Sequence, residues 1–315
     1  MSSGATVPRP ILPTALCAGS RIALISPAGP SKPERLERAI ARCRELGLEP
    51  VPGANALARH GYLAGDDDVR IADFASAIAD PGIDAIWALR GGYGTMRILS
   101  RLDLPSLRGR PKAFIGFSDN TAIHLALSRL GVVSFHGAHA GADFDKFTTD
   151  CLRNVLFRPA PAGPLPLPTD ARVRCLCGGI AEGRLAGGNL SMLAAACGTP
   201  FALDARDGIV FIEDVNEPAY RIDRAFTQLR LAGCLNGVKG FAFGSFSWEG
   251  ERPRDEPAGE EILRELVAPL GVPALAGLPF GHDGEQWCIP VGVRGRLDAG
   301  GGTLSILDPA VTANS

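Results

Sequence analysis

This sequence of 315 residues has no long apolar run, few aromatic residues and almost no excess of charge of either sign. No stretch approaches the roughly 20 apolar residues that a membrane-spanning helix needs, so we expect no membrane partner. The net charge is −2 and basic residues form no continuous tract, which argues against nucleic acid as a partner. Only 6% of residues are aromatic, too few to favour a sugar-binding site. The 46% hydrophobic content is typical of a globular protein, and a length of 315 residues is enough for about two domains.

Two common nucleotide-binding motifs are also absent. The turn after the first predicted strand, at 26–30, lacks the G-x-G-x-x-G pattern of dinucleotide-binding folds. The P-loop pattern G-x-x-x-x-G-K-[ST] occurs nowhere in the chain. The sequence therefore offers no motif for a dinucleotide or for a phosphate held in a P-loop.

The cysteines and the N-terminus indicate a reducing compartment. Eight cysteines lie mostly within apolar stretches, where a reduced cysteine behaves as a small buried hydrophobe. The close pair Cys175 and Cys177 lacks the further ligands that a structural zinc site needs. The first 20 residues contain three prolines and no sustained apolar segment of a secretory signal. We expect a cytoplasmic protein with no bound metal.

The first 158 residues form one predicted domain, in which short apolar runs alternate with amphipathic patterns from residue 21 onward. An apolar run at 21–26 precedes a helical pattern with Leu36, Ile40 and Cys43, and another short strand is expected near 48–51. Further helices are predicted at 66–79, 94–102 and 119–130, alternating with strands at 83–89, 113–117 and 132–135. This succession predicts an α/β domain with a mostly parallel sheet, whose functional residues follow the carboxyl ends of strands.

A proline-rich segment separates this domain from a second one. Residues 159–170 contain five prolines and predict a linker, which makes 171–315 the second domain. This domain opens with a β-rich stretch and a short helix at 190–197, followed by a strand at 209–212. A longer helix is indicated by apolar residues at 222, 225, 226 and 229, and further strands are expected near 240–243, 274–278, 288–291 and 303–307. We expect a mixed α/β or barrel-like domain.

Ser118 lies between a predicted buried strand and a predicted helix. A sharp turn there would expose its hydroxyl as a nucleophile, and the amide of Asp119 would point to the same spot as an oxyanion donor. The match to the G-x-S-x-G elbow is partial, because position 120 is Asn. From these residues alone, the alternative that Ser118 or Asp119 caps the helix stays open.

A glycine-rich turn, Arg90-Gly-Gly-Tyr-Gly94, follows the strand predicted at 83–89. Its glycines allow backbone amides to turn toward a ligand, so it could supply a second oxyanion donor. A tight connection between strand and helix is the simpler alternative.

Three carboxylates, Glu213, Asp214 and Glu217, follow the apolar strand at 209–212. An acid at a strand end can orient a catalytic imidazole. Glu217, and Asp214 with it, could instead complement the dipole of the helix that follows.

The five histidines have different surroundings in the sequence. His124 falls within an apolar helical pattern, and His60 lies in a loop without a companion. His136 and His139, with nearby Asp143 and Asp145, match no standard zinc spacing. His282, in a flexible Gly-Leu-Pro-Phe-Gly-His loop after an apolar run, is the best candidate for a general base.

Five blocks in this order, RGGYG, IGFSDNTA, GGNLSML, FIEDVNEPAYRIDRAFTQL and GLPFGH, resemble the LD-carboxypeptidase family of serine peptidases. The resemblance runs from about residue 21 to about residue 308. It implies Ser118 as nucleophile, Glu213 as the acid of the triad and His282 as the base. The amides of Asp119 and Gly92 would form the oxyanion hole, and Glu217 would have only a supporting role.

The resemblance also carries expectations for the whole molecule. It implies a flavodoxin-like N-terminal domain, a smaller β-rich C-terminal domain, a homodimer, and neither a metal nor an organic cofactor. Because Ser118 lies in the first domain and Glu213 and His282 in the second, the site is expected between them. The implied reaction cleaves the L,D bond of cytoplasmic murein tetrapeptides and releases D-alanine during peptidoglycan recycling. Arg90, Arg184 and Arg221 are candidates for binding the terminal carboxylate.

Three alternatives remain at this stage. The microcin C immunity peptidases are similar in triad but cleave peptidyl or aminoacyl nucleotides, which would require an aromatic platform for the base. A non-catalytic module that binds a small molecule in the same cleft is an alternative of another class. A metal-dependent hydrolase built on His136 and His139 is the third.

Overall fold

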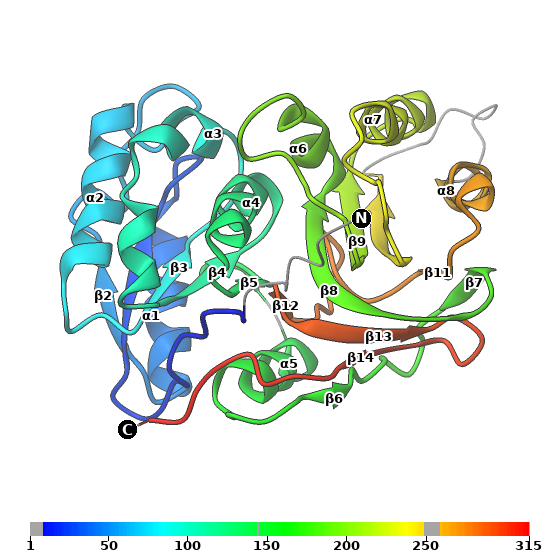
Figure 1. Cartoon of the computed structure of the whole chain (residues 1–315). Helices are drawn as coiled ribbons and strands as arrows, with labels where there is room; N and C mark the ends of the chain where they lie inside the picture. Colours follow the sequence, from blue (N-terminus) through cyan, green and yellow to red (C-terminus); the bar gives the residue numbers. More distant parts are fainter. Residues whose placement is uncertain (1–8, 144, 249–258, 315) are drawn as a thin grey trace.

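The computed structural model describes residues 9–143, 145–248 and 259–314, and it contains two β-sheets lying side by side (Figure 1). Helices cover both faces of the first sheet, whereas the helices of the second gather on one of its faces. This arrangement confirms the predicted fold class, a mostly parallel α/β domain followed by a β-rich mixed domain. The predicted boundaries at 158 and 171 stay a prediction.

The first sheet has the strand order β12-β5-β4-β3-β1-β2. Its parallel strands are β1 (Arg21–Ile25), β2 (Glu49–Pro52), β3 (Ala85–Ala88), β4 (Ala113–Gly116) and β5 (Ser134–His136). Read from β2, the parallel strands follow the order 2-1-3-4-5 of flavodoxin-like folds. In such a sheet, ligand-binding residues gather beyond the carboxyl ends of the strands.

The helices of the first domain separate into two layers. They are α1 (Pro33–Glu45), α2 (Asp67–Ala79), α3 (Thr95–Ile98), α4 (Thr121–Leu130) and α5 (Lys146–Leu156). Buried residues of α1 and α5 pack with Trp87 and Phe135 on one face of the sheet. Buried residues of α2 and α4 pack with Ile86 and Phe114 on the other. The sheet is thus covered on both faces, which explains why β3 and β4 are entirely apolar.

The second sheet has eight strands in the order β6-β14-β13-β8-β9-β10-β11-β7. They are β6 (Gly163–Pro164), β7 (Arg174–Cys177), β8 (Ile180–Asn189), β9 (Gly208–Val215), β10 (Gly240–Ser247), β11 (Ala274–Ala276), β13 (Arg294–Asp298) and β14 (Thr303–Ile306). Strands β8 to β11 are parallel to one another, and the outer strands are antiparallel. Helices α6 (Leu190–Ala195), α7 (Ala219–Leu231) and α8 (Gly259–Val267) pack over one face of this sheet.

One hydrophobic core joins the two sheets. Trp87 and Phe135 of the first sheet belong to the same buried cluster as Phe211 of β9, and Phe280 and Trp287 of the loop after β11. Because this cluster spans both domains, residues at the facing ends of the two sheets are held together by buried apolar contacts.

The strand predicted at 288–291 exists, but it does not join the other strands predicted after residue 171 in the second sheet. As β12 (Ile289–Val291) it pairs antiparallel with β5 and forms the edge of the first sheet. This pairing covers the edge of β5, and the side chains of Ile289 and Val291 are buried. The local sequence pattern cannot specify which strand β12 pairs with. Helices α5 and α8 and strand β13 were not predicted.

No helix within the described ranges is both long and apolar enough to span a membrane. All eight cysteines are free, and Cys43, Cys151, Cys234 and Cys288 are buried. Cys17 and Cys175 are exposed, so the apolar context predicted for the cysteines holds for only part of them.

Candidate active site

Ser118 lies at a sharp turn between β4 and α4. Strand β4 ends at Gly116, residues 118–120 form a short 3-10 turn, and α4 begins at Thr121. The φ of Ser118 is 59°, a left-handed conformation that a residue with a β-carbon adopts only at a cost. Such a strained turn exposes a side chain at the carboxyl edge of the sheet, as a nucleophile requires. No side chain caps α4, so the alternative that Ser118 or Asp119 is a helix cap is wrong.

His282 and Glu213 approach Ser118 from the second domain. The Nε2 atom of His282 lies 3.2 Å from Ser118 Oγ. Its Nδ1 atom lies 2.7 Å from Oε2 of Glu213. Glu213 is at the carboxyl end of β9, and His282 is in the loop that follows β11. The structure therefore brings three predicted site residues from distant segments into one hydrogen-bonded chain.

Burial and hydrogen bonding shift the pKa values of Glu213 and His282. Glu213 is completely buried and its Oε1 atom has no hydrogen-bond partner among the described residues. Burial raises the pKa of Glu213, while the hydrogen bond from His282 opposes this shift. For His282, burial disfavours the charged ring, but the hydrogen bond and negative charge of Glu213 outweigh it, so its pKa is raised. A raised imidazole pKa makes His282 a stronger base toward the serine proton.

Two neighbours hold the His282 loop in place. The backbone N–H of His282 donates a hydrogen bond to Oγ of Ser245, at 3.1 Å, from strand β10. Gly281 has a φ of 118°, and a β-carbon there would lie 2.5 Å from Ser245 Oγ and 3.0 Å from Glu213 Cβ. Only glycine fits between these two side chains. Sequence reasoning missed Ser245, because a single serine in an apolar strand gives no local signal.

The glycine-rich turn lies directly against the nucleophile. A β-carbon on Gly91 would lie 2.9 Å from Ser118 Cβ and 3.4 Å from the Asp119 nitrogen. The carbonyl of Gly91 accepts from the N–H of Gly29 at 3.1 Å, so the N–H of Gly92, across the planar trans peptide, points the opposite way. No described residue accepts a hydrogen bond from that Gly92 N–H. Both predicted oxyanion donors thus belong to segments that surround Ser118.

Asp119 is fixed by its side chain. Its carboxylate accepts from the Thr95 amide at 2.9 Å, and Thr95 Oγ1 donates to the Asp119 carbonyl at 2.6 Å. The buried carboxyl has a raised pKa because of desolvation, which these hydrogen bonds oppose. Thr95 opens α3, so the helix after the glycine-rich turn anchors the residue after the nucleophile.

The other two acids have structural contacts. Asp214 is buried and accepts from the side chain of Asn189 at 2.8 Å and from the Ser191 amide at 2.9 Å. Asp214 therefore holds the start of α6. The sequence had suggested a role at the start of α7 instead. The backbone N–H of Asn189 donates to Thr121 Oγ1 at 3.0 Å, which ties β8 to α4 across the domains. Glu217 pairs with Arg221, at 3.4 Å, on α7.

Three histidines are buried and neutral near the site. His139 stacks on Phe117 with ring centroids 4.3 Å apart. The ring centroids of Phe117 and His282 are 4.9 Å apart. Burial lowers the pKa of His139 to about 3 and that of His124 to about 4. His136 has a lowered pKa for the same reason, and neither of its ring nitrogens has a partner among the described residues. These rings form an uncharged wall beside the catalytic loop.

The predicted metal-binding alternative lacks a ligand set. Asp143 is mostly exposed and pairs with Arg38 at 3.4 Å, and Asp145 caps α5 through the Thr148 amide. Across the residues the structure describes, no three His, Cys, Asp or Glu side chains are grouped closely enough to hold a metal ion. His60 lies in a turn and contacts Leu63 through a backbone bridge.

The three candidate arginines occupy different places. Arg90 is half-buried in the glycine-rich turn, where its Nε donates to the Gly91 carbonyl at 3.2 Å and its Nη1 to the Pro30 carbonyl, also at 3.2 Å. Arg221 is exposed on α7, and Arg184 lies near the middle of β8. Of the three, Arg90 belongs to the turn whose Gly91 lies against Ser118.

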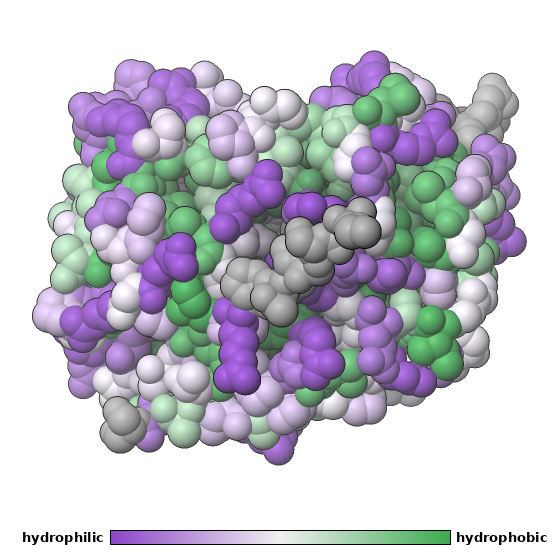
Figure 2. Space-filling view, in the orientation of Figure 1, coloured by the Kyte–Doolittle hydropathy of each residue, from purple (hydrophilic) through white to green (hydrophobic). Residues whose placement is uncertain are grey.

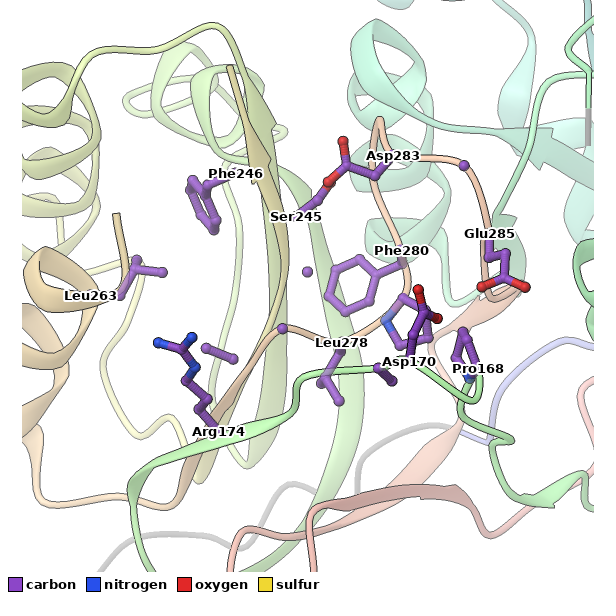
Figure 3. Close-up of a pocket in the computed structure, with 16 residues that line it drawn as sticks. Pro168, Asp170, Arg174, Ser245, Phe246, Leu263, Leu278, Phe280, Asp283 and Glu285 are labelled. Atoms are coloured by element: carbon purple, nitrogen blue, oxygen red, sulfur yellow. The ribbon is translucent and has the colours of Figure 1, made fainter. Parts of the chain in front are cut away.

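A cavity of about 740 Å³ borders the loop that carries His282. Figure 3 shows Phe246 and Arg174 on one side of it and Asp283 and Glu285 on the other, with Phe280 projecting between them. Ser118 does not line this cavity, whereas Ser245, which accepts the His282 N–H, does.

Two protein-family models match the chain. The LD-carboxypeptidase N-terminal domain matches residues 22–137, and the LD-carboxypeptidase C-terminal domain matches residues 182–297. The first match includes Ser118, and the second includes both Glu213 and His282.

Individual relatives agree with these matches along nearly the whole chain. A Streptomyces coelicolor protein is 40% identical, covering 96% of this chain and 97% of its own length. The murein tetrapeptide carboxypeptidase of Pseudomonas aeruginosa is 34% identical, covering 88% and 93%. The muramoyltetrapeptide carboxypeptidase of Oxalobacter formigenes superposes with a TM-score of 0.81 at 32% identity, covering 94% and 100%. The microcin C7 self immunity protein has a TM-score of 0.88 at 22% identity, which is a likeness of fold alone.

Proposed function

The chain belongs to the LD-carboxypeptidase family, and from this premise we propose that it is a serine carboxypeptidase which releases the terminal D-alanine of murein tetrapeptides. The observation that carries the proposal is the hydrogen-bonded chain from Ser118 through His282 to Glu213, with distances of 3.2 and 2.7 Å. A nucleophile, a base and a buried acid in this order are the parts that acyl transfer requires. The P. aeruginosa and O. formigenes relatives, named for murein tetrapeptides, support the substrate class.

The reaction begins when the serine attacks the substrate. His282 Nε2 takes the proton of Ser118 Oγ as the oxygen attacks the carbonyl carbon of the last peptide bond. The amides of Asp119 and Gly92 stabilise the negative oxygen of the tetrahedral intermediate. Glu213 holds the imidazole by its Nδ1–H and stabilises the positive charge that His282 acquires.

Departure of D-alanine then forms the acyl-enzyme. His282 gives its proton to the leaving nitrogen, and D-alanine departs with its free carboxylate, which leaves the peptide esterified to Ser118. In the second half, the same imidazole takes a proton from water as the water oxygen attacks this ester. His282 returns that proton to Ser118 Oγ as the shortened peptide leaves, and the enzyme regains its starting state. The Arg90 guanidinium, held at the glycine-rich turn that contacts Ser118, pairs with the terminal carboxylate of the substrate and aligns the scissile bond.

The setting of this activity is part of the proposal. The enzyme acts in the cytoplasm, on murein peptides taken up for recycling, and it works as a homodimer without metal or organic cofactor. The mass of the purified protein in solution, measured by light scattering, tests the dimer directly. A monomer at working concentration would contradict it.

The decisive experiment follows D-alanine release by mass spectrometry from the tetrapeptide L-Ala-D-Glu-meso-diaminopimelate-D-Ala. The wild-type chain should release D-alanine, and Ser118→Ala should not, while its thermal melt stays close to that of the wild type. A peptidyl nucleotide is tested in parallel. Turnover of the nucleotide conjugate alone would replace the murein assignment by a microcin C immunity-type activity. Failure of a folded wild-type protein on both substrates would leave the non-catalytic binding module.

A further inference from the structure

A second cavity, of about 320 Å³, lies between the two domains at the far end of α4 from the nucleophile. His124, Leu125 and residues 128–131, from the middle to the C-terminal end of this ten-residue helix, line it. At 1.5 Å per residue, the C-terminal end is about 15 Å from the turn that carries Ser118, and none of Ser118, Glu213 and His282 lines the cavity. Figure 2 shows hydrophilic side chains near the middle of the face in view, where the two domains meet. The cavity is thus separate from the site described above.

Four arginines from both domains line this cavity. Arg108 and Arg129 belong to the first domain, Arg184 to β8 of the second, and Arg9 to the N-terminal segment. Asp204 is the single carboxylate among the lining residues. An adjoining cavity of about 290 Å³ shares Arg9 and Arg184 and is lined also by Arg294.

The carboxylate does not neutralise this charge. Asp204 accepts two hydrogen bonds from Arg206, at 2.9 and 2.7 Å, and these hydrogen bonds lower its pKa to about 2. Its contact with Arg129 is longer, at 3.8 Å. The guanidiniums of Arg9, Arg108 and Arg184 have no acceptor among the described residues, and residues 1–8 contain no Asp or Glu.

Strand pairing adds to the excess of positive charge. Arg184 of β8 and Arg294 of β13 are direct cross-strand partners, so their side chains stand on the same face of the sheet. Like charges in directly opposite positions are destabilising. Asp308 compensates Arg294 with hydrogen bonds of 2.9 and 2.8 Å, which leaves half-buried Arg184 uncompensated.

We propose that this interdomain cavity binds a phosphorylated small molecule. Guanidinium groups match phosphate oxygens with paired, charge-assisted hydrogen bonds, and three uncompensated arginines suit a group with more than one negative charge. The cavity volume fits a compound of a few phosphate-sized units rather than a macromolecule. Because its arginines come from both domains, the ligand bridges them and stabilises the domain arrangement in which Ser118 meets His282.

The test uses the full chain, with inorganic pyrophosphate as the probe, in isothermal titration and thermal-melt experiments at constant ionic strength. We expect saturable binding of one pyrophosphate per chain and a rise in melting temperature. Arg184→Gln and Arg108→Gln should each weaken binding about tenfold, the loss expected for one charged hydrogen-bonding partner. Arg44→Gln, on the exposed side of α1 and outside the cavity, is the matched control and should bind like the wild type.

Specific results would overturn this proposal. Pyrophosphate that binds no better than the added salt contradicts the site, as does equal binding by the wild type and the folded double variant of Arg108 and Arg184. Citrate binding as tightly as pyrophosphate contradicts the phosphate assignment. The Ser118→Ala protein must bind pyrophosphate like the wild type, because loss of binding in that variant places the anion at the nucleophile instead.

Discussion

Gly91 and Ser118 are in such close contact that a β-carbon on Gly91 would lie 2.9 Å from the serine Cβ and 3.0 Å from its Oγ. Neither atom can withdraw easily, because Ser118 is held at a φ of 59° and hydrogen-bonded to His282. There is therefore no room for a side chain at position 91 next to the nucleophile.

We predict that Gly91→Ala abolishes most of the activity without unfolding the protein. The added methyl group displaces Ser118 Oγ from His282, and a misplacement of about 1 Å in a reacting group can cost about 100-fold in rate. D-alanine release measures kcat/KM, and thermal melting measures stability. Gly109→Ala is the control, since its β-carbon would meet nothing closer than 3.8 Å. Wild-type kcat/KM in Gly91→Ala would show that this contact is not restrictive.

The pH dependence should follow the pairing of His282 with Glu213. The imidazole acts as a base only when neutral, so activity rises with pH through the His282 pKa, which Glu213 raises above the ordinary 6.5. Glu213→Gln removes the negative charge and leaves the burial, which lowers the pKa. We therefore expect a lower kcat and an acid limb of the kcat/KM profile that moves to lower pH. Profiles from pH 5 to 9 for both proteins test this, and an unmoved limb would refute it.

Local patterns predicted the elements whose environment is uniform along their length. Strands β3 and β4 are apolar throughout because both sheet faces are covered, and helix α7 buries Ile222, Phe226 and Leu229 along one side. The position of Ser118 after such a strand was equally visible. To prefer Ser118 as a nucleophile over Ser118 as a helix cap, the sequence analysis needed the ordered motifs of a family. A strand-to-helix turn that carries a nucleophile and one that carries a helix cap contain the same residue types.

Contacts between distant segments could not be predicted in this way. Strand β12 was placed in the wrong sheet, because its apolar sequence fits either sheet and only tertiary pairing with β5 decides. The hydrogen bond from His282 to Ser245 joins residues 37 positions apart, and neither residue signals the other. The arginines between the domains gather only after both domains have folded and packed together.

Ser245 should act as a positioning residue. Its hydroxyl accepts the backbone N–H of His282, so Ser245→Ala leaves that amide without its partner and loosens the catalytic loop. We expect a fall in kcat of about tenfold with little change in KM, since the substrate does not need this hydrogen bond to bind. Ser245→Thr, which keeps the hydroxyl, should recover part of the loss. The exposed Ser76→Ala serves as the control. An increase in KM at unchanged kcat would instead place Ser245 in substrate binding.

Arg90 should affect substrate binding more than the chemical step. Its guanidinium lies beside Gly91 and is anchored by the Pro30 and Gly91 carbonyls, which leaves further N–H groups for a substrate carboxylate. Arg90→Gln removes that charge, and we expect KM to rise about tenfold, as for the loss of one charged hydrogen bond, with a smaller change in kcat. Arg221→Gln, at an exposed position of α7, is the matched control.

A second substrate makes the Arg90 experiment specific. If Arg90 pairs with the terminal carboxylate, a tetrapeptide amidated at its C-terminus should have a raised KM with the wild type. Arg90→Gln should then not raise the KM of this amidated peptide any further. The two changes then remove the same interaction, and their effects on KM are not additive. Additive effects would show that Arg90 acts elsewhere, for example by holding the glycine-rich turn against Ser118, and the carboxylate would need another partner.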